Sequence, residues 1–311
     1  MKLSSVWSEI ERVARREHAI HVGVSDVRDA HASVFADWIA NRGHASMAYL
    51  AKNVATREDP SARFAWAKSV IVLLIPYSSE RPNAPEGALS HHVARYALGD
   101  DYHDVLDSIL HKLENEIARL APGIKTWRYV DTGPLSDRSL AAQAGLGWIG
   151  KNGMLIHEEQ GSYFFIGTLL TSLENDLHAG EVADRCGACT RCIDACPTHA
   201  ILPNRTVESE LCISYATIEH RGAFDIDTAG NAFGCDICQE VCPWNAAPPE
   251  PHPAFLPRDE YRATPVTDLV KFTQTDFSAL FRKSAVKRAK LAGMKRNVEA
   301  LERRRESGER R

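Results

Sequence analysis

The chain has 311 residues, of which 44% are hydrophobic and 25% are charged, and this composition is that of a soluble protein with about two domains. Its longest apolar stretch, residues 70–75, is far shorter than a bilayer span, and its first 13 residues mix charges with apolar side chains, so the sequence excludes a membrane helix and a secretory signal and predicts a cytoplasmic protein. The net charge is only −4, so charge is informative through its distribution along the chain rather than through its total.

The N-terminal part of the chain alternates amphipathic helices with apolar strands. Helices are predicted where apolar residues recur at every third or fourth position, near 6–13, over 106–120 and from about 135. Strands are predicted over four apolar stretches, 20–24, 69–75, 124–130 and 163–170. This alternation predicts an α/β or mixed α+β domain over residues 1–175.

Two loops of this domain carry candidate functional groups. Asp131 follows the strand over 124–130, at the position where open α/β sheets place their ligands, which suits a proton donor. The alternative is that Asp131 caps a helix starting at Pro134 or Leu135. The glycine-rich turn 145–152 offers backbone donors and a lysine to an anionic or amide-bearing cofactor, although its spacing is neither Walker nor Rossmann.

The segment that begins with Asp101 contains Asp-x-His, the start of the Asp-x-His-x-x-Gly loop through which a histidine binds the cobalt of cobalamin. Here Leu106 replaces the glycine, and the same residue begins the amphipathic helix. Asp101 is therefore interpreted as a helix cap, and His103 as a structural residue rather than a cobalt ligand.

All eight cysteines lie between Cys186 and Cys242, in two runs that each close with Cys-Pro. In bacterial two-cluster ferredoxins the first three cysteines of such a run hold one cluster, and the fourth holds the other. The spacing therefore predicts two 4Fe-4S clusters in an electron-transfer module over residues 176–247. The first cluster is assigned to Cys186, Cys189, Cys192 and Cys242, and the second to Cys196, Cys212, Cys235 and Cys238.

Four disulfides and two closed zinc sites are the alternatives for these cysteines. Disulfide-rich scaffolds are usually small secreted chains, whereas here a long cysteine-free segment precedes the first thiol. A tetrahedral zinc site uses two Cys-x2-Cys pairs and has no use for the third cysteine of the first run. Both alternatives are disfavoured.

A proline-rich stretch and a basic helical tail are predicted over residues 248–311. Residues 281–311 hold twelve Lys or Arg against four Glu, so the rest of the chain carries about −12. This asymmetry suggests a polyanionic partner. The alternative is a solvated helix in which Met294, Val298 and Leu301 pack inward and the arginines face water.

Taken together, several segments of the chain resemble the epoxyqueuosine reductase family. The resemblance rests on six stretches, 43–50, 95–103, 130–134, 144–151, 212–219 and 234–245. It implies an N-terminal cobalamin-binding domain related to that of reductive dehalogenases, beside a ferredoxin-like module. It also implies reduction of epoxyqueuosine to queuosine at the wobble position of tRNA, with electrons passing from two 4Fe-4S clusters to cobalamin.

The resemblance assigns roles to particular residues. Asp131 becomes the proton donor, and burial is expected to raise its pKa so that it keeps its proton near neutral pH. Cobalamin contacts are expected from Lys52, Arg57, Asp131, Lys151, Asn152, Ser162 and Ser214. Contacts with tRNA phosphates are expected from Arg282, Lys283, Lys287, Arg288, Lys295 and Arg296.

The expected partners are tRNA carrying epoxyqueuosine in its anticodon stem-loop and an electron donor such as a ferredoxin or flavodoxin, with the chain acting as a monomer. Longer family members continue into a helical-repeat region, so the extent of the RNA contact is open. One alternative function is a corrinoid iron-sulfur reductive dehalogenase, although the twin-arginine signal and larger body usual for that class are absent from this sequence. The other is a ferredoxin-type electron carrier without its own substrate.

Overall fold

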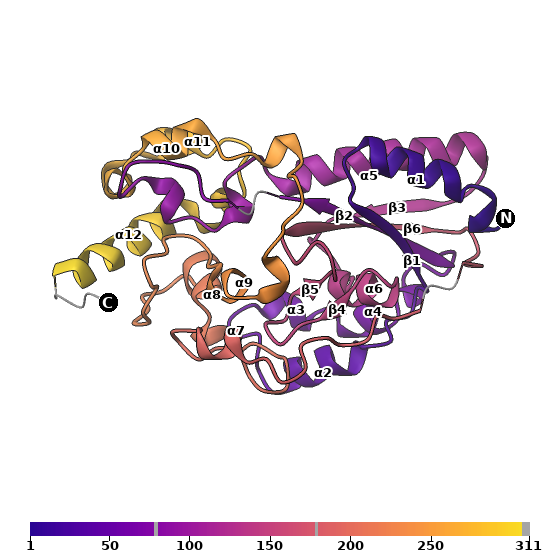
Figure 1. Ribbon diagram of the computed structural model, residues 1–311, viewed down its shortest axis with the longest axis horizontal. Helices are drawn as coiled ribbons and strands as arrows, with labels where there is room; N and C mark the ends of the chain where they lie inside the picture. The colour runs from indigo at the N-terminus through magenta and orange to yellow at the C-terminus, as the bar shows by residue number, and fades with distance from the viewer. Residues whose placement is uncertain (78–79, 178–179, 307–311) are drawn as a thin grey trace.

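The computed structural model describes residues 1–77, 80–177 and 180–306. Its N-terminal half is built on a four-stranded sheet (Figure 1) in which every neighbouring pair of strands is antiparallel. The strands lie in the order β1 (His21–Ser25), β2 (Ser69–Pro76), β6 (Phe164–Thr171) and β3 (Thr126–Tyr129). The mixed α+β fold is therefore confirmed, and the parallel α/β alternative is wrong.

The two central strands are buried on both faces, which explains why the sequence of β2 is a continuous apolar run. Ile71, Leu73 and Ile75 pack with α1 (Trp7–Arg16) and α5 (Tyr102–Leu120), the two helices above the sheet in Figure 1. The alternate residues Val70, Val72 and Leu74 pack on the other side, against α6 (Asp137–Gln143). Successive side chains of a strand point to opposite faces, so this one run supplies two cores.

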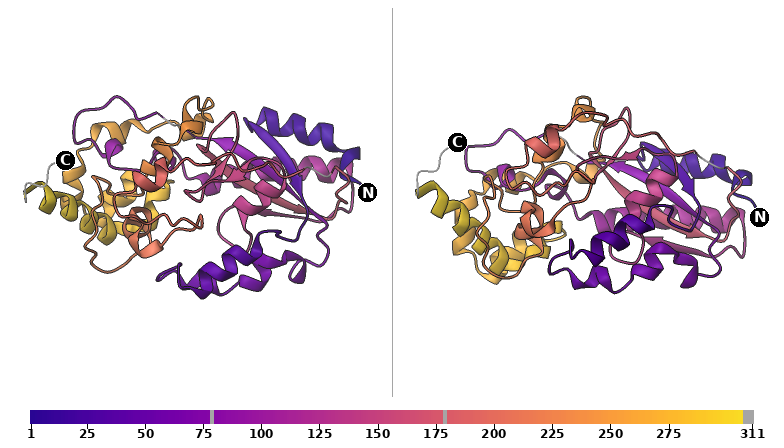
Figure 2. Two further views of the ribbon diagram at one scale, coloured as in Figure 1. Left: turned by 60° about the horizontal axis from the view of Figure 1, so that its bottom comes forward. Right: turned by 90° about the horizontal axis from the view of Figure 1, so that it is seen from below.

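Short helices lie between β1 and β2, and they connect the sheet domain with the cysteine-bearing segment. These helices are α2 (Ala32–Ala40), α3 (Ala48–Ala51) and α4 (Val54–Glu58). Figure 2 shows them as an arm that extends from the sheet toward the C-terminal half of the chain. Trp38 Nε1 donates a hydrogen bond to the Val207 carbonyl at 2.9 Å, and the Ser46 amide donates to the Tyr215 hydroxyl at 3.2 Å. A small hairpin is formed by β4 (Trp148–Ile149) and β5 (Leu155–Ile156).

The C-terminal half contains short helices joined by long loops. The cysteine-bearing segment includes α7 (Arg191–Asp194), α8 (Ile213–Ile218) and α9 (Ile237–Glu240). After it come α10 (Asp259–Ala263), α11 (Gln274–Leu280) and α12 (Lys290–Glu306). Met294, Val298 and Leu301 are buried in a core shared with these helices, so the inward packing that belonged to the solvated-helix alternative is confirmed.

The predicted domain ranges 1–175, 176–247 and 248–311 remain a prediction, and the hydrophobic cores cross them twice. Leu89, Val93 and Leu98 belong to the same core as α11 and α12, although they come before α5 in the chain. Phe255 packs with α1 and α5 of the sheet domain. The chain therefore passes between the two halves several times, and each pass ties them together.

Most of the predicted elements are confirmed at their predicted positions. The edge strand β3 is shorter than predicted, and α6 begins at Asp137 with Ser136 as its N-cap residue. The interpretation of Asp131 as the cap of this helix is therefore wrong. Asp101 caps α5 as predicted, because its side chain accepts a hydrogen bond from the His103 amide. Among the described residues, no helix is both long and apolar enough to cross a membrane.

Candidate active site and iron-sulfur centre

The eight cysteines are free thiols that gather in two groups. The first group lines a single small pocket together with Lys151, Asn152 and Trp244, and consists of Cys186, Cys189, Cys192 and Cys242. Three of these come from the loop around α7, and the fourth comes from the end of α9, more than forty residues later. The local turns of both runs therefore bring distant parts of the segment to one point.

The second group consists of Cys196, Cys212, Cys235 and Cys238. Burial raises the pKa of Cys235, and the nearby thiols of Cys212 and Cys196 add to this effect. Burial also raises the pKa of Cys238, with contributions from Cys235 and Cys212. A bound metal needs cysteine in the thiolate form, and the positive charge of the metal deprotonates a thiol that it binds. Buried thiols with a raised pKa are therefore compatible with a metal site. The two groups are those predicted from the spacing, while the role of the thiols as cluster ligands stays a prediction.

The structure also bears on the two alternatives for the cysteines. The disulfide interpretation is wrong, because all eight cysteines are free. In the described part of the chain, no three His, Cys, Asp or Glu side chains are grouped so that they could hold one metal ion.

Asp131 lies directly after β3 in a strained backbone conformation. Its φ is +53°, in the left-handed region that non-glycine residues rarely adopt. The Tyr129 hydroxyl donates a hydrogen bond to its carbonyl at 2.7 Å. The Tyr102 hydroxyl donates to its carboxylate at 2.6 Å, and 62% of its side chain is solvent-accessible. The loop thus presents a fixed carboxylate to solvent, as a group that acts on a substrate must be presented.

The expectation that Asp131 has a raised pKa is wrong. Desolvation by the protein packed around the loop raises its pKa, but the nearby imidazolium of His103 and the hydrogen bond from Tyr102 lower it below its usual value. Hydrogen bonds to the charged form of a carboxyl group stabilise that form. Asp131 is therefore ionised near neutral pH in this arrangement.

His103 is the neighbour that the sequence interpretation undervalued. Its Nδ1 lies 2.8 Å from the Asp101 carboxylate, and its Nε2 lies 3.7 Å from the Asp131 carboxylate. Burial lowers the pKa of His103, but the two carboxylates outweigh burial and raise it to about 9. At neutral pH the imidazolium of His103 therefore carries the proton that Asp131 lacks. Its place in the first turn of α5, beside the end of β3, depends on packing between segments far apart in the sequence.

The surroundings of Asp131 fit a ligand rich in amide groups, as cobalamin is. Several polar atoms here are buried without a hydrogen-bond partner, including His103 Nε2, Asp137 Oδ1 and Arg57 Nε. Burial and the charge of Asp131 raise the pKa of Asp137 well above its usual range, which favours the protonated form, and a protonated carboxyl group can both donate and accept hydrogen bonds. Native structures rarely leave such groups unpaired, and the amides of a bound molecule can pair with them. The sequence alone did not single out Asp137, because an Asp in the first turn of a helix is commonplace.

Of the residues predicted to contact cobalamin, only Asp131 and Arg57 lie at this site. Arg57 donates hydrogen bonds to the carbonyls of Leu135 and Gly133 at 2.6 and 2.7 Å, which braces the loop that carries Asp131. Lys52 is exposed on the arm after α3. None of these contacts tests cobalamin binding, so the assignments stay predictions.

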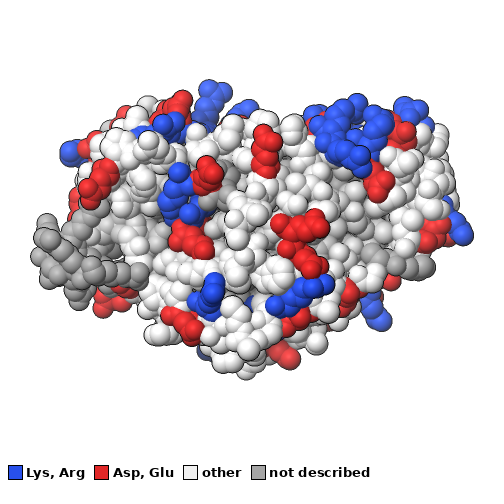
Figure 3. Space-filling view, viewed as in Figure 1, with Lys and Arg blue, Asp and Glu red and all other residues white. Residues whose placement is uncertain are grey.

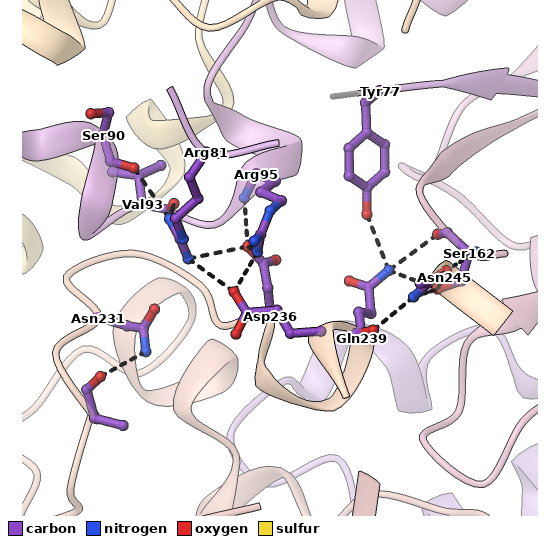
Figure 4. Close-up of polar contacts among 12 residues, drawn as sticks. Tyr77, Arg81, Ser90, Val93, Arg95, Ser162, Asn231, Asp236, Gln239 and Asn245 are labelled. Carbon is purple, nitrogen blue, oxygen red and sulfur yellow. Dashed lines mark hydrogen bonds and ion pairs between the residues drawn. The ribbon is translucent and has the colours of Figure 1, made fainter. Parts of the chain in front are cut away.

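The remaining predicted contacts are engaged with the cysteine-bearing segment. Lys151 donates to the carbonyls of Gly187 and Cys189, and Asn152 donates to that of Cys238. Ser162 is buried and bonded to Gln239 and Asn245 (Figure 4). Ser214 is half-buried, two residues after Cys212. Lys151, Asn152 and Ser162 thus join the two halves of the molecule, which leaves fewer of their polar groups for a cofactor.

The residues predicted to contact tRNA differ in their freedom. Arg282, Lys283 and Lys287 are exposed, and Lys295 is half-buried. Arg288 is exposed as well, but it makes a two-point ion pair with Glu219 at 2.8 and 3.0 Å. Arg296 donates to the carbonyls of His220, Gly222 and Ala216.

Arg288 and Arg296 therefore hold the tail helix and the turn before it against the end of α8, and Arg282, Lys283 and Lys287 are the better candidates for phosphate contacts. On the face seen in Figure 3, basic and acidic side chains are mixed, and the densest basic group lies over α1.

Comparison with known proteins assigns the chain to a class and then to a family. Residues 185–245 match the model of a 4Fe-4S double cluster binding domain, so the fold and the two thiol groups define an iron-sulfur oxidoreductase. Residues 57–132, which include Asp131, match the model described as "Epoxyqueuosine reductase QueG, DUF1730". The chain is 39% identical to the epoxyqueuosine reductase of Leadbetterella byssophila over 89% of its own length and 91% of the relative. The chain belongs to the epoxyqueuosine reductase family.

Further relatives and solved structures agree with this assignment. The epoxyqueuosine reductase of Synechocystis is 37% identical, over 88% of this chain and 95% of the relative. A solved epoxyqueuosine reductase with an epoxyqueuosine-modified tRNA-Tyr stem loop superposes with a TM-score of 0.86 at 27% identity, covering 96% of this chain and 80% of the other. The family resemblance, the enzyme class and the fold predicted from the sequence are thereby confirmed, which removes support from the dehalogenase and electron-carrier alternatives.

Proposed function

We propose that this protein reduces epoxyqueuosine to queuosine at the wobble position of tRNA, with cobalamin bound at the Asp131 site and two 4Fe-4S clusters bound by the eight cysteines. Family membership carries the proposal, since relatives 34 to 39% identical over most of the chain are epoxyqueuosine reductases. The stem loop in the solved relative supports an anticodon stem-loop as the partner. The unpaired polar atoms around Asp131 support the cobalamin site.

The cofactors supply chemistry that side chains lack: the clusters deliver electrons singly, and cobalamin provides a strongly reducing cobalt centre. What the chain must add is binding, orientation and a proton. Opening an epoxide places negative charge on the departing oxygen, and an acid must protonate that oxygen. Asp131 is the exposed carboxyl group at this site, and its strained loop is braced by Arg57 and Tyr129.

The proton is proposed to come from the His103–Asp131 pair rather than from a permanently neutral Asp131. Near neutral pH the pair holds one proton, on His103, whose pKa is raised to about 9. Nε2 of His103 lies 3.7 Å from the Asp131 carboxylate, so a small approach brings the two groups within hydrogen-bond distance. Transfer of that proton to Asp131 and onward to the oxygen leaves His103 neutral and Asp131 ionised. Asp101, bonded to Nδ1 at 2.8 Å, holds the ring in this orientation.

The partners follow from the same chemistry. Because tRNA and reduced thiols are found together in the cytoplasm, we propose that the protein acts there, as a monomer. A small redox protein such as a ferredoxin or flavodoxin is the proposed electron donor. Exposed Arg282, Lys283 and Lys287 are the proposed phosphate contacts beside the tail helix.

Anaerobic incubation of the reconstituted protein with tRNA containing epoxyqueuosine tests the function, with and without cobalamin and a chemical reductant. The nucleosides are then digested and weighed by mass spectrometry. Cobalamin-dependent loss of one oxygen atom from epoxyqueuosine is the expected result. No conversion by protein with a full iron complement and reducible clusters would contradict the proposal. It would favour a different corrinoid substrate, such as an organohalide, or a pure electron carrier.

A further inference from the structure

A buried carboxylate lies between two of the predicted cluster ligands. Asp236 follows Cys235, precedes the helix α9 that carries Cys238, and is 2% exposed. A negative charge at this position opposes the addition of an electron to a cluster bound by its neighbours. Such a carboxylate is stable in the interior only if it is paired and hydrogen-bonded.

Two arginines from the segment that precedes α5 pair with this carboxylate (Figure 4). The backbone amide of Arg95 donates to Asp236 at 2.8 Å, and its guanidinium donates to the same oxygen at 3.1 Å. The guanidinium of Arg81 lies 3.5 Å from that oxygen, and its other nitrogen donates to the carbonyls of Ser90 and Val93 at 3.2 and 3.1 Å. Both arginines also contact Glu240 at the end of α9. Two positive charges thus face two negative ones.

The other side of α9 is held by uncharged contacts. The Gln239 side-chain amide, which is 5% exposed, donates to the Tyr77 hydroxyl at 3.3 Å and to the Ser162 carbonyl and hydroxyl at 3.1 Å (Figure 4). The Asn245 amide donates to the Gln239 carbonyl at 2.8 Å. Because these bonds carry no net charge, they can keep the helix in place when one of the charges opposite is removed. The charge beside the predicted cluster can therefore be changed without moving α9.

We propose that Arg95 and Arg81 set the reduction potential of the cluster assigned to Cys196, Cys212, Cys235 and Cys238, by neutralising the buried Asp236. The inference rests on the cluster assignment in the proposed function and goes beyond it. It names two positioning residues, neither of which is a ligand, that keep this cluster reducible. A cluster next to an uncompensated carboxylate is harder to reduce, and a cluster beside a surplus guanidinium is easier to reduce.

Single-charge variants with opposite expected signs test the proposal. Arg81→Gln and Arg95→Gln each remove a positive charge. At a fixed electrode potential, the reduced-to-oxidised ratio of this cluster should fall about tenfold in each variant. This change corresponds to a shift of about 59 mV in the reduction potential of a one-electron couple. Glu240→Gln removes a negative charge at a side chain that is 36% exposed, so the ratio should rise. Arg95→Lys keeps the charge and should stay near the wild-type ratio. The readout is an anaerobic redox titration followed by EPR, on protein with its iron content measured.

Arg128→Gln is the matched control. Arg128 lies on β3 of the sheet domain and forms ion pairs with Asp107 and Glu114 on α5. It should leave both cluster signals at their wild-type potentials. Structural damage to the cluster site would change the reduced-to-oxidised ratio in the same direction in Arg81→Gln and Glu240→Gln. An electrostatic effect changes the ratio in opposite directions in these two variants. If both variants assemble two clusters and neither ratio changes by more than about twofold, the proposal is wrong.

A variant of Arg95 that fails to fold leaves this comparison intact, since Arg81 is 25% exposed and more peripheral. Turnover of epoxyqueuosine-containing tRNA by the wild type is measured in the same preparations. A wild type that assembles both clusters but converts no tRNA would contradict the proposed substrate. The shifts of potential would still decide the electrostatic proposal.

Discussion

The cysteine-bearing segment and the Asp131 site are encoded in different ways. All eight thiols come from 57 consecutive residues, and their spacing alone groups them as the structure does. The Asp131 site draws Arg57, the first turn of α5 and the loop after β3 from segments separated by packed elements. The cysteine groups can be predicted from the spacing of residues in one short segment. The Asp131 site can be predicted only when the pairing of the strands is known. The predictions below test each region against the other.

The largest expected effect is the loss of one cluster. Cys196→Ser removes a thiol that belongs by sequence to the first run but by assignment to the second cluster. The iron content should fall from about eight to about four atoms per chain, and the surviving EPR signal should be the one that Cys186→Ser removes. If the two variants lost the same cluster, the crossed assignment would be wrong and each run would hold its own cluster.

The second-largest effect is expected at the Asp131 site. Asp131→Asn keeps the size and most hydrogen bonds of the side chain but removes its acid, so single-turnover conversion should fall by about 10² to 10⁴. Cobalamin binding, measured by titration of its absorbance, and both cluster signals should stay as in the wild type. The control is Asp104→Asn, at an exposed side chain in the first turn of α5, which should be neutral. Normal turnover by Asp131→Asn would remove the proton donor from the proposal.

His103 should shape the pH dependence of the same reaction. Its pKa of about 9 means that wild-type conversion stays high at neutral pH and falls as the pH rises through about 9, when the pair loses its proton. His103→Gln should be slower by roughly 10- to 100-fold at pH 7 and should lack this alkaline decline. An alkaline decline that persists unchanged in the variant would assign it to another group.

The His103 pair should also affect stability, with a definite sign. The pKa of a histidine rises from about 6.5 in the unfolded chain to about 9 in the folded one, so folding favours the protonated form. The stabilisation is complete below pH ~6.5 and is lost as the pH rises toward 9. It should amount to about 1 to 2 kcal/mol, because the ring is partly exposed. Thermal unfolding of the wild type and His103→Gln should therefore differ most below pH 6.5 and converge near pH 9.5.

The difference between local and distant contacts also explains which parts of the fold could be predicted from the sequence. The periodicity of α5 and the apolar runs of β2 and β6 are local, so their positions were predicted to within a few residues. The strand order and the antiparallel pairing depend on contacts between β1, β2, β6 and β3 across 150 residues, and the sequence left α/β and α+β open.

The same limit applies to the charges of the site. The pKa expected for Asp131 took account of burial but not of Tyr102 and His103, and these two side chains reverse its direction. The role of Asp236 could not be predicted for a similar reason, since its partner Arg95 lies 141 residues earlier in the chain and Arg81 lies earlier still.

The smallest expected effect concerns the tail, where two basic side chains of similar appearance should act differently. Lys287 is exposed, so Lys287→Gln should weaken binding of an anticodon stem-loop a few-fold. It should also reduce the slope of log affinity against log salt concentration by about 1, the signature of one phosphate contact.

Arg296 is the internal comparison. It donates to three backbone carbonyls around α8, so Arg296→Gln should leave these acceptors unpaired and lower the unfolding free energy by about 1 to 3 kcal/mol while the salt slope stays constant. Lys271→Gln, at a side chain that is 78% exposed, controls for the loss of any surface charge. If Lys271 and Lys287 had equal effects on the slope, attraction between the RNA and the total charge of the protein would explain the binding, and a defined footprint at the tail would be excluded.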